Sequence, residues 1–179
     1  MHVKLSFPAA IDVQITKGII RLWQKNATLN YLVISVARWT SIIMLILIIC
    51  ASQGYLLTAQ NREVAFKSAV ISIVAAFIGR AVNEPIARLV SRPRPFEEMQ
   101  FIPLTEHDRG DSYPSNHSTG AFALAIGCIH VPGYNVILLT LAVFLAISRV
   151  YCGLHYTSDV FMGTMHGIVI ACLCLWIAF

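Results

Sequence analysis

Long apolar runs, separated by short polar stretches, dominate the 179-residue sequence. Five such runs occur, over residues 31–57, 66–90, 118–131, 134–151 and 157–179, the third of them short. A helix needs about 20 mostly apolar residues to cross a bilayer, and 57% of all residues here are hydrophobic while only 12% are charged. An open sheet cannot satisfy its backbone in lipid. The sequence therefore predicts an all-α, polytopic membrane helical bundle with about five transmembrane helices.

The segment before the first run has the pattern of a surface helix. Ile11, Ile15, Ile19 and Leu22 recur at helical spacing, with charged and polar residues between them. This pattern predicts an amphipathic helix at the membrane interface, and a helix packed on a soluble partner is the alternative. The sequence shows no linker, low-complexity tract or internal repeat, so we expect residues 1–179 to form a single membrane domain.

Three polar stretches carry most of the reactive side chains: "SRPRPF" (91–96), "YPSNHS" (113–118) and "SRVYCGLHYTSD" (148–159). The first follows the second apolar run and the second precedes the third run, so both lie at one end of the bundle. The third and fourth runs form a hairpin that returns the last stretch to the same end. Topology thus predicts a cluster of Arg94, Ser115, His117, Arg149, His155 and Asp159.

The residue types in this cluster suit phosphoryl transfer. Arginine guanidinium groups match phosphate oxygens, and the start of a helix at Ser115 offers free N–H groups to an anion. An aspartate close to a histidine orients the imidazole and raises its basicity, and His155 and Asp159 are four residues apart. His117, on another segment, is then available to protonate a leaving oxygen. Individually each residue could be a membrane anchor or a capping group, but together they predict a phosphohistidine mechanism.

The three stretches resemble the signature motifs of the type 2 phosphatidic acid phosphatase superfamily: an Arg-Pro motif, a Pro-Ser-Gly-His-like motif, and Ser-Arg-x₃-Gly-x-His-x₃-Asp. The resemblance implies a metal-independent phosphatase for lipid phosphates that needs no cofactor. It further implies that His155 attacks phosphorus, that Asp159 orients His155, and that His117 is the general acid and later activates water. The residues expected to hold the phosphoryl oxygens are Arg94, Ser115, the amide of Asn116, and Arg149.

Two positions depart from the family pattern. Ala87 stands where the first motif often has lysine, with Arg88 beside it, and Asn116 replaces a glycine. With its small size and short spacing between the first two motifs, the chain most resembles the bacitracin-resistance-type undecaprenyl pyrophosphate phosphatases. The expected substrate is undecaprenyl pyrophosphate, with Arg92, His107 and Arg109 as possible contacts of its outer phosphate.

Other readings stay open at this stage. The same chemistry could serve phosphatidic acid, phosphatidylglycerol phosphate or a lipid A phosphate. A transporter is a less favoured alternative, because no repeated halves with paired broken helices are found. A non-catalytic lipid-binding protein is also less favoured, because His155, Asp159 and His117 are all present. Two further side chains lie within apolar runs: we expect Arg80 to pair with Glu84, and His166 to make an interhelical hydrogen bond.

The charge of the chain bears on its binding partners and on its orientation in the membrane. The net charge of +4 is modest, and the basic residues form no dense stripe, so the partners expected are the lipid substrate and the bilayer and not a nucleic acid. The resemblance implies a multi-pass protein of the bacterial inner membrane, with its site facing the periplasm or cell exterior. The distribution of basic residues favours the cytoplasm instead. No sequence feature indicates an oligomeric state.

Overall fold

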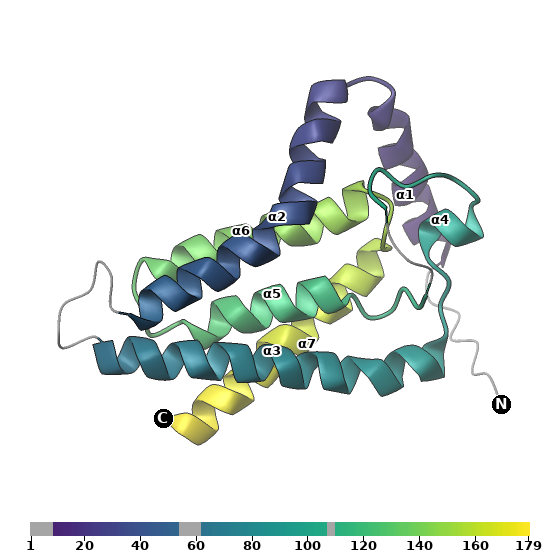
Figure 1. Ribbon diagram of the computed structural model, residues 1–179. Coiled ribbons are helices and arrows are strands. Elements are labelled where there is room, and N and C mark those ends of the chain that lie inside the picture. Colours follow the sequence, from purple (N-terminus) through teal and green to yellow (C-terminus); the bar gives the residue numbers. More distant parts are fainter. Residues whose placement is uncertain (1–8, 54–61, 107–109) are drawn as a thin grey trace.

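The computed structural model describes residues 9–53, 62–106 and 110–179, and these form helices and turns without any strand. The helices are α1 (Ala9–Trp23), α2 (Ala27–Ser52), α3 (Arg62–Val90), α4 (Pro95–Glu98), α5 (Asn116–Gly127), α6 (Tyr134–Tyr151) and α7 (Thr157–Ala178). Each apolar run overlaps one of the helices α2, α3, α5, α6 and α7 (Figure 1). The predicted all-α bundle is confirmed.

Four segments are long and apolar enough to cross a membrane: α2, α3 together with α4, α6, and α7. The exception among the five runs is α5, whose 12 residues span about 18 Å against a hydrocarbon core of about 30 Å. It lies in the middle of the bundle, in contact with α3, α6 and α7 (Figure 1). Of the five predicted spans, four are therefore long helices, and the fifth is a short helix that these surround.

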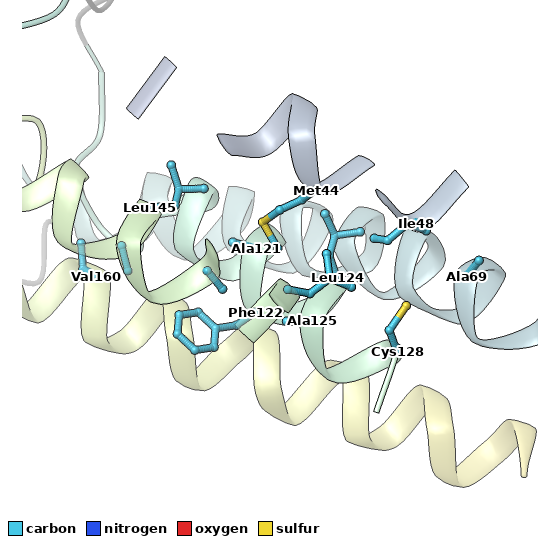
Figure 2. Close-up of a cluster of buried hydrophobic side chains, with 13 residues drawn as sticks. Met44, Ile48, Ala69, Ala121, Phe122, Leu124, Ala125, Cys128, Leu145 and Val160 are labelled. Carbon is cyan, nitrogen blue, oxygen red and sulfur yellow. The ribbon is translucent and has the colours of Figure 1, made fainter. Parts of the chain in front are cut away.

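The hydrophobic core surrounds α5. Figure 2 shows Met44 and Ile48 of α2 reaching toward the Ala121 and Leu124 side of α5, and all of these side chains are buried in one cluster. Phe122, on the same helix, belongs to that cluster together with residues of α6 and α7. The central position of α5 therefore comes from an apolar surface on all its sides.

Two glycines let α7 approach α5 closely. A Cβ atom added at Gly163 would lie 2.5 Å from the carbonyl oxygen of Ser115, and one added at Gly167 would lie 2.3 Å from that of Thr119. Small residues one turn apart allow membrane helices to pack backbone against backbone. This contact sets the position of the start of α5, where the polar stretch "YPSNHS" enters the helix.

Helix α1 confirms the surface helix predicted for this segment and shows which side it presents to the bundle. It contacts α6 and α7 near the point where one ends and the other begins. Ile11 is 60% exposed and Leu22 46%, whereas Asp12 is only 4% exposed. Asp12 and Thr16 therefore face the protein, whereas Ile11, Ile15 and Leu22 are exposed, as contact with lipid requires. The charged side chains Lys17 and Arg21 are exposed as well.

The three polar stretches meet at one end of the bundle, as the order of runs predicted. Helix α3 continues through Pro85 to Val90 and leads into α4, while α5 and α7 begin, and α6 ends, at this same end (Figure 1). The opposite end holds the C-terminal Phe179, whose ring contacts His130 and Lys67.

Candidate active site

The site is a buried group of polar residues contributed by four segments. Arg94 precedes α4, Ser115 precedes α5, Arg149 lies in the last turn of α6, and His155 lies between α6 and α7. None of these side chains is more than 8% exposed. Buried charged groups need partners of opposite charge or strong hydrogen bonds, so their contacts indicate what this site binds.

His155 is held by both ring nitrogens. Its Nδ1 lies 2.7 Å from the carbonyl oxygen of Ser112, and its Nε2 lies 3.3 Å from Nη1 of Arg94. A carbonyl can only accept, so Nδ1 carries the hydrogen and Nε2 keeps its lone pair. Burial, followed by the positive charges of Arg94 and Arg149, holds the pKa of His155 well below its usual 6.5. The imidazole is therefore neutral near pH 7, with Nε2 turned toward the arginines.

The two arginines carry buried donors that no described residue accepts. Arg94 donates from Nη1 to the carbonyl oxygen of Leu154 at 3.2 Å, but its Nε has no partner among the described residues. The same holds for Nε and Nη2 of Arg149. Unsatisfied buried donors are rare in folded proteins because each costs free energy. An anion with several oxygens, such as a phosphoryl group, would satisfy all three.

The start of α5 adds backbone donors to this site. Ser115 is the N-cap, with its side chain accepting from the N–H of Ser118, and its hydroxyl lies 3.1 Å from that of Ser118. The N–H groups in the first turn of a helix have no acceptor within the helix and carry a partial positive charge. The amides of Asn116 and His117 are in that turn, so they can donate to an anion bound at the start of α5.

Asp159 does not contact His155 directly, although their spacing suggested a pair. Its Oδ2 accepts from the hydroxyl of Ser112 at 2.5 Å and from the N–H of Tyr156 at 2.9 Å, which caps α7. Because the carboxylate serves as a helix cap, it is turned toward the backbone of its own segment. Ser112 bridges the two residues: its hydroxyl binds Asp159 and its carbonyl oxygen binds His155.

Ser112 was missed by the sequence analysis. It directly precedes the polar stretch "YPSNHS", but no spacing rule relates it to either partner, since it is more than 40 residues away from both. Only the close approach of the segment before α5 to the α6–α7 turn brings it there.

Arg92 is held by carboxylates and not free above the site. Its guanidinium lies 2.7 Å from Asp159 Oδ1 and 2.8 Å from Asp12 Oδ2, and it stacks on the ring of Tyr156 at 4.1 Å. Asp12 also accepts hydrogen bonds from the N–H and hydroxyl of Ser158. These contacts oppose the expected role of Arg92 as an outer phosphate contact. The other two expected contacts, His107 and Arg109, lie outside the described residues.

His117 and Asn116 line a cavity of about 250 Å³ between α2, α3 and α5. The side-chain oxygen of Asn116 accepts from Asn83 of α3 at 2.9 Å, and Asn83 also donates to Thr119. Nδ1 of His166 lies 2.9 Å from the side-chain oxygen of Asn83. The interhelical hydrogen bond expected for His166 is thus confirmed. It holds Asn83, which in turn donates to two residues at the start of α5.

The expected pair of Arg80 and Glu84 is wrong. Glu84 binds Arg88 instead, at 2.9 Å, and Arg80 lines the cavity beside His117. Both pairs have the i, i+4 spacing, but a glutamate placed before its basic partner is the more favourable order in a helix. The Arg88 side chain is 75% exposed, so it does not take the place of the lysine missing at Ala87.

These features define a membrane helical bundle with a buried, arginine-rich anion site at one end, and the comparisons agree with that class. The chain belongs to the PAP2 superfamily, whose family model matches residues 68–179. Its fold is shared with a crystal structure of a transmembrane PAP2-type phosphatidylglycerolphosphate phosphatase from Bacillus subtilis. The TM-score is 0.73 at 21% identity, over 94% of this chain and 85% of that one.

Sequence relatives carry two kinds of names. YbjG of Escherichia coli K12, provisionally assigned as an undecaprenyl-diphosphatase, is 38% identical over 119 residues, which are 65% of this chain and 57% of YbjG. A lipid A 1-phosphatase of Rhizobium etli is 32% identical, over 72% of this chain and 60% of that protein. The undecaprenyl-diphosphatase BcrC of Bacillus subtilis is 25% identical over 91% of this chain and 82% of its own length. The chain thus spans about three fifths of the first two relatives.

Proposed function

We propose that this protein is a membrane phosphatase that hydrolyses undecaprenyl pyrophosphate to undecaprenyl phosphate and inorganic phosphate, for recycling of the cell-wall lipid carrier. The observation that carries the proposal is the set of buried, unsatisfied donors of Arg94 and Arg149 beside the neutral imidazole of His155. A nucleophile surrounded by fixed donors for phosphoryl oxygens is what phosphoryl transfer requires.

In the first step, Nε2 of His155 attacks the terminal phosphorus. The bond from this phosphorus to the bridging oxygen breaks, its electron pair leaves with the lipid phosphate, and His117 donates a proton to that oxygen. Arg94, Arg149, Ser115 and the amide of Asn116 hold the three equatorial oxygens. The product of this step is a phosphohistidine and the lipid monophosphate.

In the second step, water replaces the lipid. His117, now neutral, removes a proton from a water molecule, whose oxygen attacks the phosphorus and breaks its bond to Nε2. Inorganic phosphate leaves and His155 returns to its neutral form. Asp159 acts on His155 through Ser112, whose carbonyl oxygen keeps the hydrogen on Nδ1 in both steps.

We further propose that the reaction needs no metal ion. In many phosphatases a divalent ion neutralises the phosphoryl charge, whereas here two arginines and the start of α5 can supply that positive potential. Turnover that persists at full rate in excess EDTA would support this proposal. A requirement for an added divalent ion would contradict it.

The lipid A 1-phosphatase relatives favour one second candidate, hydrolysis of a lipid A phosphate. Phosphatidic acid and phosphatidylglycerol phosphate are further substrates to compare. We propose the bacterial inner membrane as the location, with the site facing the periplasm or cell exterior, where the spent carrier is released.

The central test is phosphate release by purified full-length protein from undecaprenyl pyrophosphate in detergent. His155→Ala is expected to abolish release and to prevent trapping of a phosphoenzyme from terminally ³²P-labelled substrate. His130→Ala is the matched control, because His130 lies at the opposite end of the bundle against Phe179. Release at the wild-type rate by folded His155→Ala protein would refute the mechanism.

A further inference from the structure

Arg80 is a cation inside a membrane-spanning helix that has no partner within the described part of the protein. It lies more than two turns before the end of α3 at Val90, and the nearest carboxylate along the helix, Glu84, is bound to Arg88. No hydrogen bond, ion pair or ring contact of Arg80 is present among the described residues. An ionised side chain at membrane depth is costly and usually marks a functional site.

Arg80 and His117, the proposed general acid, line the same cavity. Arg80, Asn116 and His117 are the charged and polar side chains of α3 and α5 that line this cavity of about 250 Å³. Most of its other lining residues are apolar: Met44, Leu45, Ile73, Ala76, Phe77, Ala121 and Leu124. A lipid chain can therefore lie along the apolar walls while its polar group reaches His117 and Arg80.

Because Arg80 and His117 line the same cavity, the part of the substrate that lies near His117 is also the part that Arg80 can contact. In the proposed reaction the transferred phosphoryl group lies against Arg94 and Arg149, and the leaving group lies on the side of His117. The leaving group of a lipid diphosphate is a lipid monophosphate, which is anionic. The leaving group of a monophosphate ester is a neutral alcohol. A cation beside His117 therefore meets a second phosphate only when the substrate is a diphosphate.

We propose that Arg80 binds the phosphate that remains on the lipid and thereby selects lipid diphosphates over lipid monophosphate esters. This inference rests on the proposed function and deepens it. When the bond to the bridging oxygen breaks, the electron pair adds negative charge to the departing monophosphate. His117 protonates the bridging oxygen, and Arg80 stabilises the remaining charge. Arg80 thus takes the role that the sequence had suggested for Arg92, which is bound to Asp12 and Asp159.

The test compares two substrates in one enzyme. Steady-state kcat/KM is measured in mixed micelles for farnesyl diphosphate and for dioctanoyl phosphatidic acid, with wild type, Arg80→Ala and Arg80→Lys. Loss of one charge-assisted contact lowers binding by about ten- to hundredfold, so Arg80→Ala is expected to lose that factor on the diphosphate and less than about threefold on phosphatidic acid. Arg80→Lys should recover part of the loss. Arg88→Ala, an exposed arginine of the same helix, should retain both activities.

Several outcomes overturn the inference. Equal losses of Arg80→Ala on both substrates would make Arg80 a structural residue or a membrane anchor, and no loss on the diphosphate would remove it from the site. Thermal denaturation in detergent checks folding: because the variant deletes a costly charge, its melting temperature should match or exceed that of wild type.

Binding separates the inference from the proposed function. If wild type hydrolyses neither these two substrates nor undecaprenyl pyrophosphate, the proposed function fails, and Arg80 is judged by equilibrium binding of farnesyl diphosphate to His155→Ala protein. About tenfold weaker binding after adding Arg80→Ala supports the inference. Unchanged binding refutes it.

Discussion

At the scale of single residues, the link between Asp159 and His155 passes through Ser112. The hydroxyl of Ser112 binds the carboxylate, and its carbonyl oxygen holds Nδ1 of the imidazole. The four-residue spacing suggests a direct contact between the aspartate and the histidine. Here the carboxylate instead binds Ser112, whose carbonyl oxygen accepts from the imidazole. Asp159 also binds Arg92, which in turn binds Asp12 of α1. A chain of contacts thus runs from His155 to the surface helix α1, and we propose that this chain orients the histidine.

Replacing Ser112 by alanine tests this link. The change removes the hydroxyl and leaves the carbonyl in place, and a hydrogen bond to a charged group contributes about 1.5–3 kcal/mol. We expect kcat to fall by about ten- to hundredfold with little change in KM, measured as phosphate release from farnesyl diphosphate. Ser72→Ala, which removes a hydroxyl that contacts Cys128 in the core, is the control. A folded Ser112→Ala enzyme with normal kcat would show that Asp159 does not act through Ser112.

The lowered pKa of His155 predicts that the acid limb of the pH–activity profile lies at a lower pH than for an ordinary histidine. In the proposed mechanism the neutral imidazole attacks, and its pKa lies below 6.5 because of burial and of Arg94 and Arg149. Activity should therefore persist as pH falls through 6.5 and decline only when pH reaches the lowered pKa. Arg149→Gln removes one positive charge, so the pKa of His155 should rise and the acid limb of kcat/KM should move to higher pH. Profiles with the limb at the same pH in both proteins would contradict this explanation.

At the scale of elements, the contact between α5 and α7 sets the position of the first turn of α5, which is the proposed phosphate-binding end. Gly163 lies against the carbonyl oxygen of Ser115, the N-cap of α5. We expect Gly163→Ala to lower stability by about 1–3 kcal/mol, because the added methyl group forces the helices apart, and to reduce kcat by moving the first turn of α5. Thermal denaturation in detergent and phosphate release measure the two effects.

The matched control for this substitution is Gly18→Ala in α1. A Cβ at Gly18 meets nothing within 4 Å, so the variant should be as stable as wild type or slightly more stable. If Gly163→Ala behaves like Gly18→Ala, the close packing of α7 on α5 does not determine the geometry of the site.

At the scale of the whole molecule, the site and the C-terminal end of α7 lie at opposite ends of the bundle (Figure 1). If the site faces the periplasm, a green fluorescent protein fused after Phe179 is cytoplasmic and fluoresces, while an alkaline phosphatase fused there is inactive. Ile102, which is 89% exposed in the loop after α4, provides the complementary probe. In a Cys172→Ser background, Ile102→Cys should react with a membrane-impermeant maleimide in cells whose outer membrane is permeabilised. The reverse pattern would place the site in the cytoplasm, as the distribution of basic residues suggests.

Much of the fold could be predicted from the sequence, because it depends on properties that are local along the chain. The length of an apolar run determines whether a helix can span a bilayer, and the order of runs determines which polar stretches share an end. These rules located the helices that flank Arg94, Ser115 and His155, the helix that carries Arg149, and the end at which the four residues meet. The short helix α5 shows where the length rule fails. A helix that is enclosed by other helices does not need to be long enough to span the bilayer, and it does not need to contact lipid.

The sequence by itself determined the class of chemistry, since arginines and histidines in apolar surroundings at one end of a bundle fit an anionic lipid group. Only the tertiary structure decided the partner of each side chain: Ser112 for Asp159, Asp12 for Arg92, and the cavity beside His117 for Arg80. The reason is physical. Helix formation and membrane insertion follow from averages over many residues, whereas hydrogen bonds and ion pairs require atoms from distant segments to lie within about 3 Å. Backbone packing, such as the approach of α7 to α5, sets those distances.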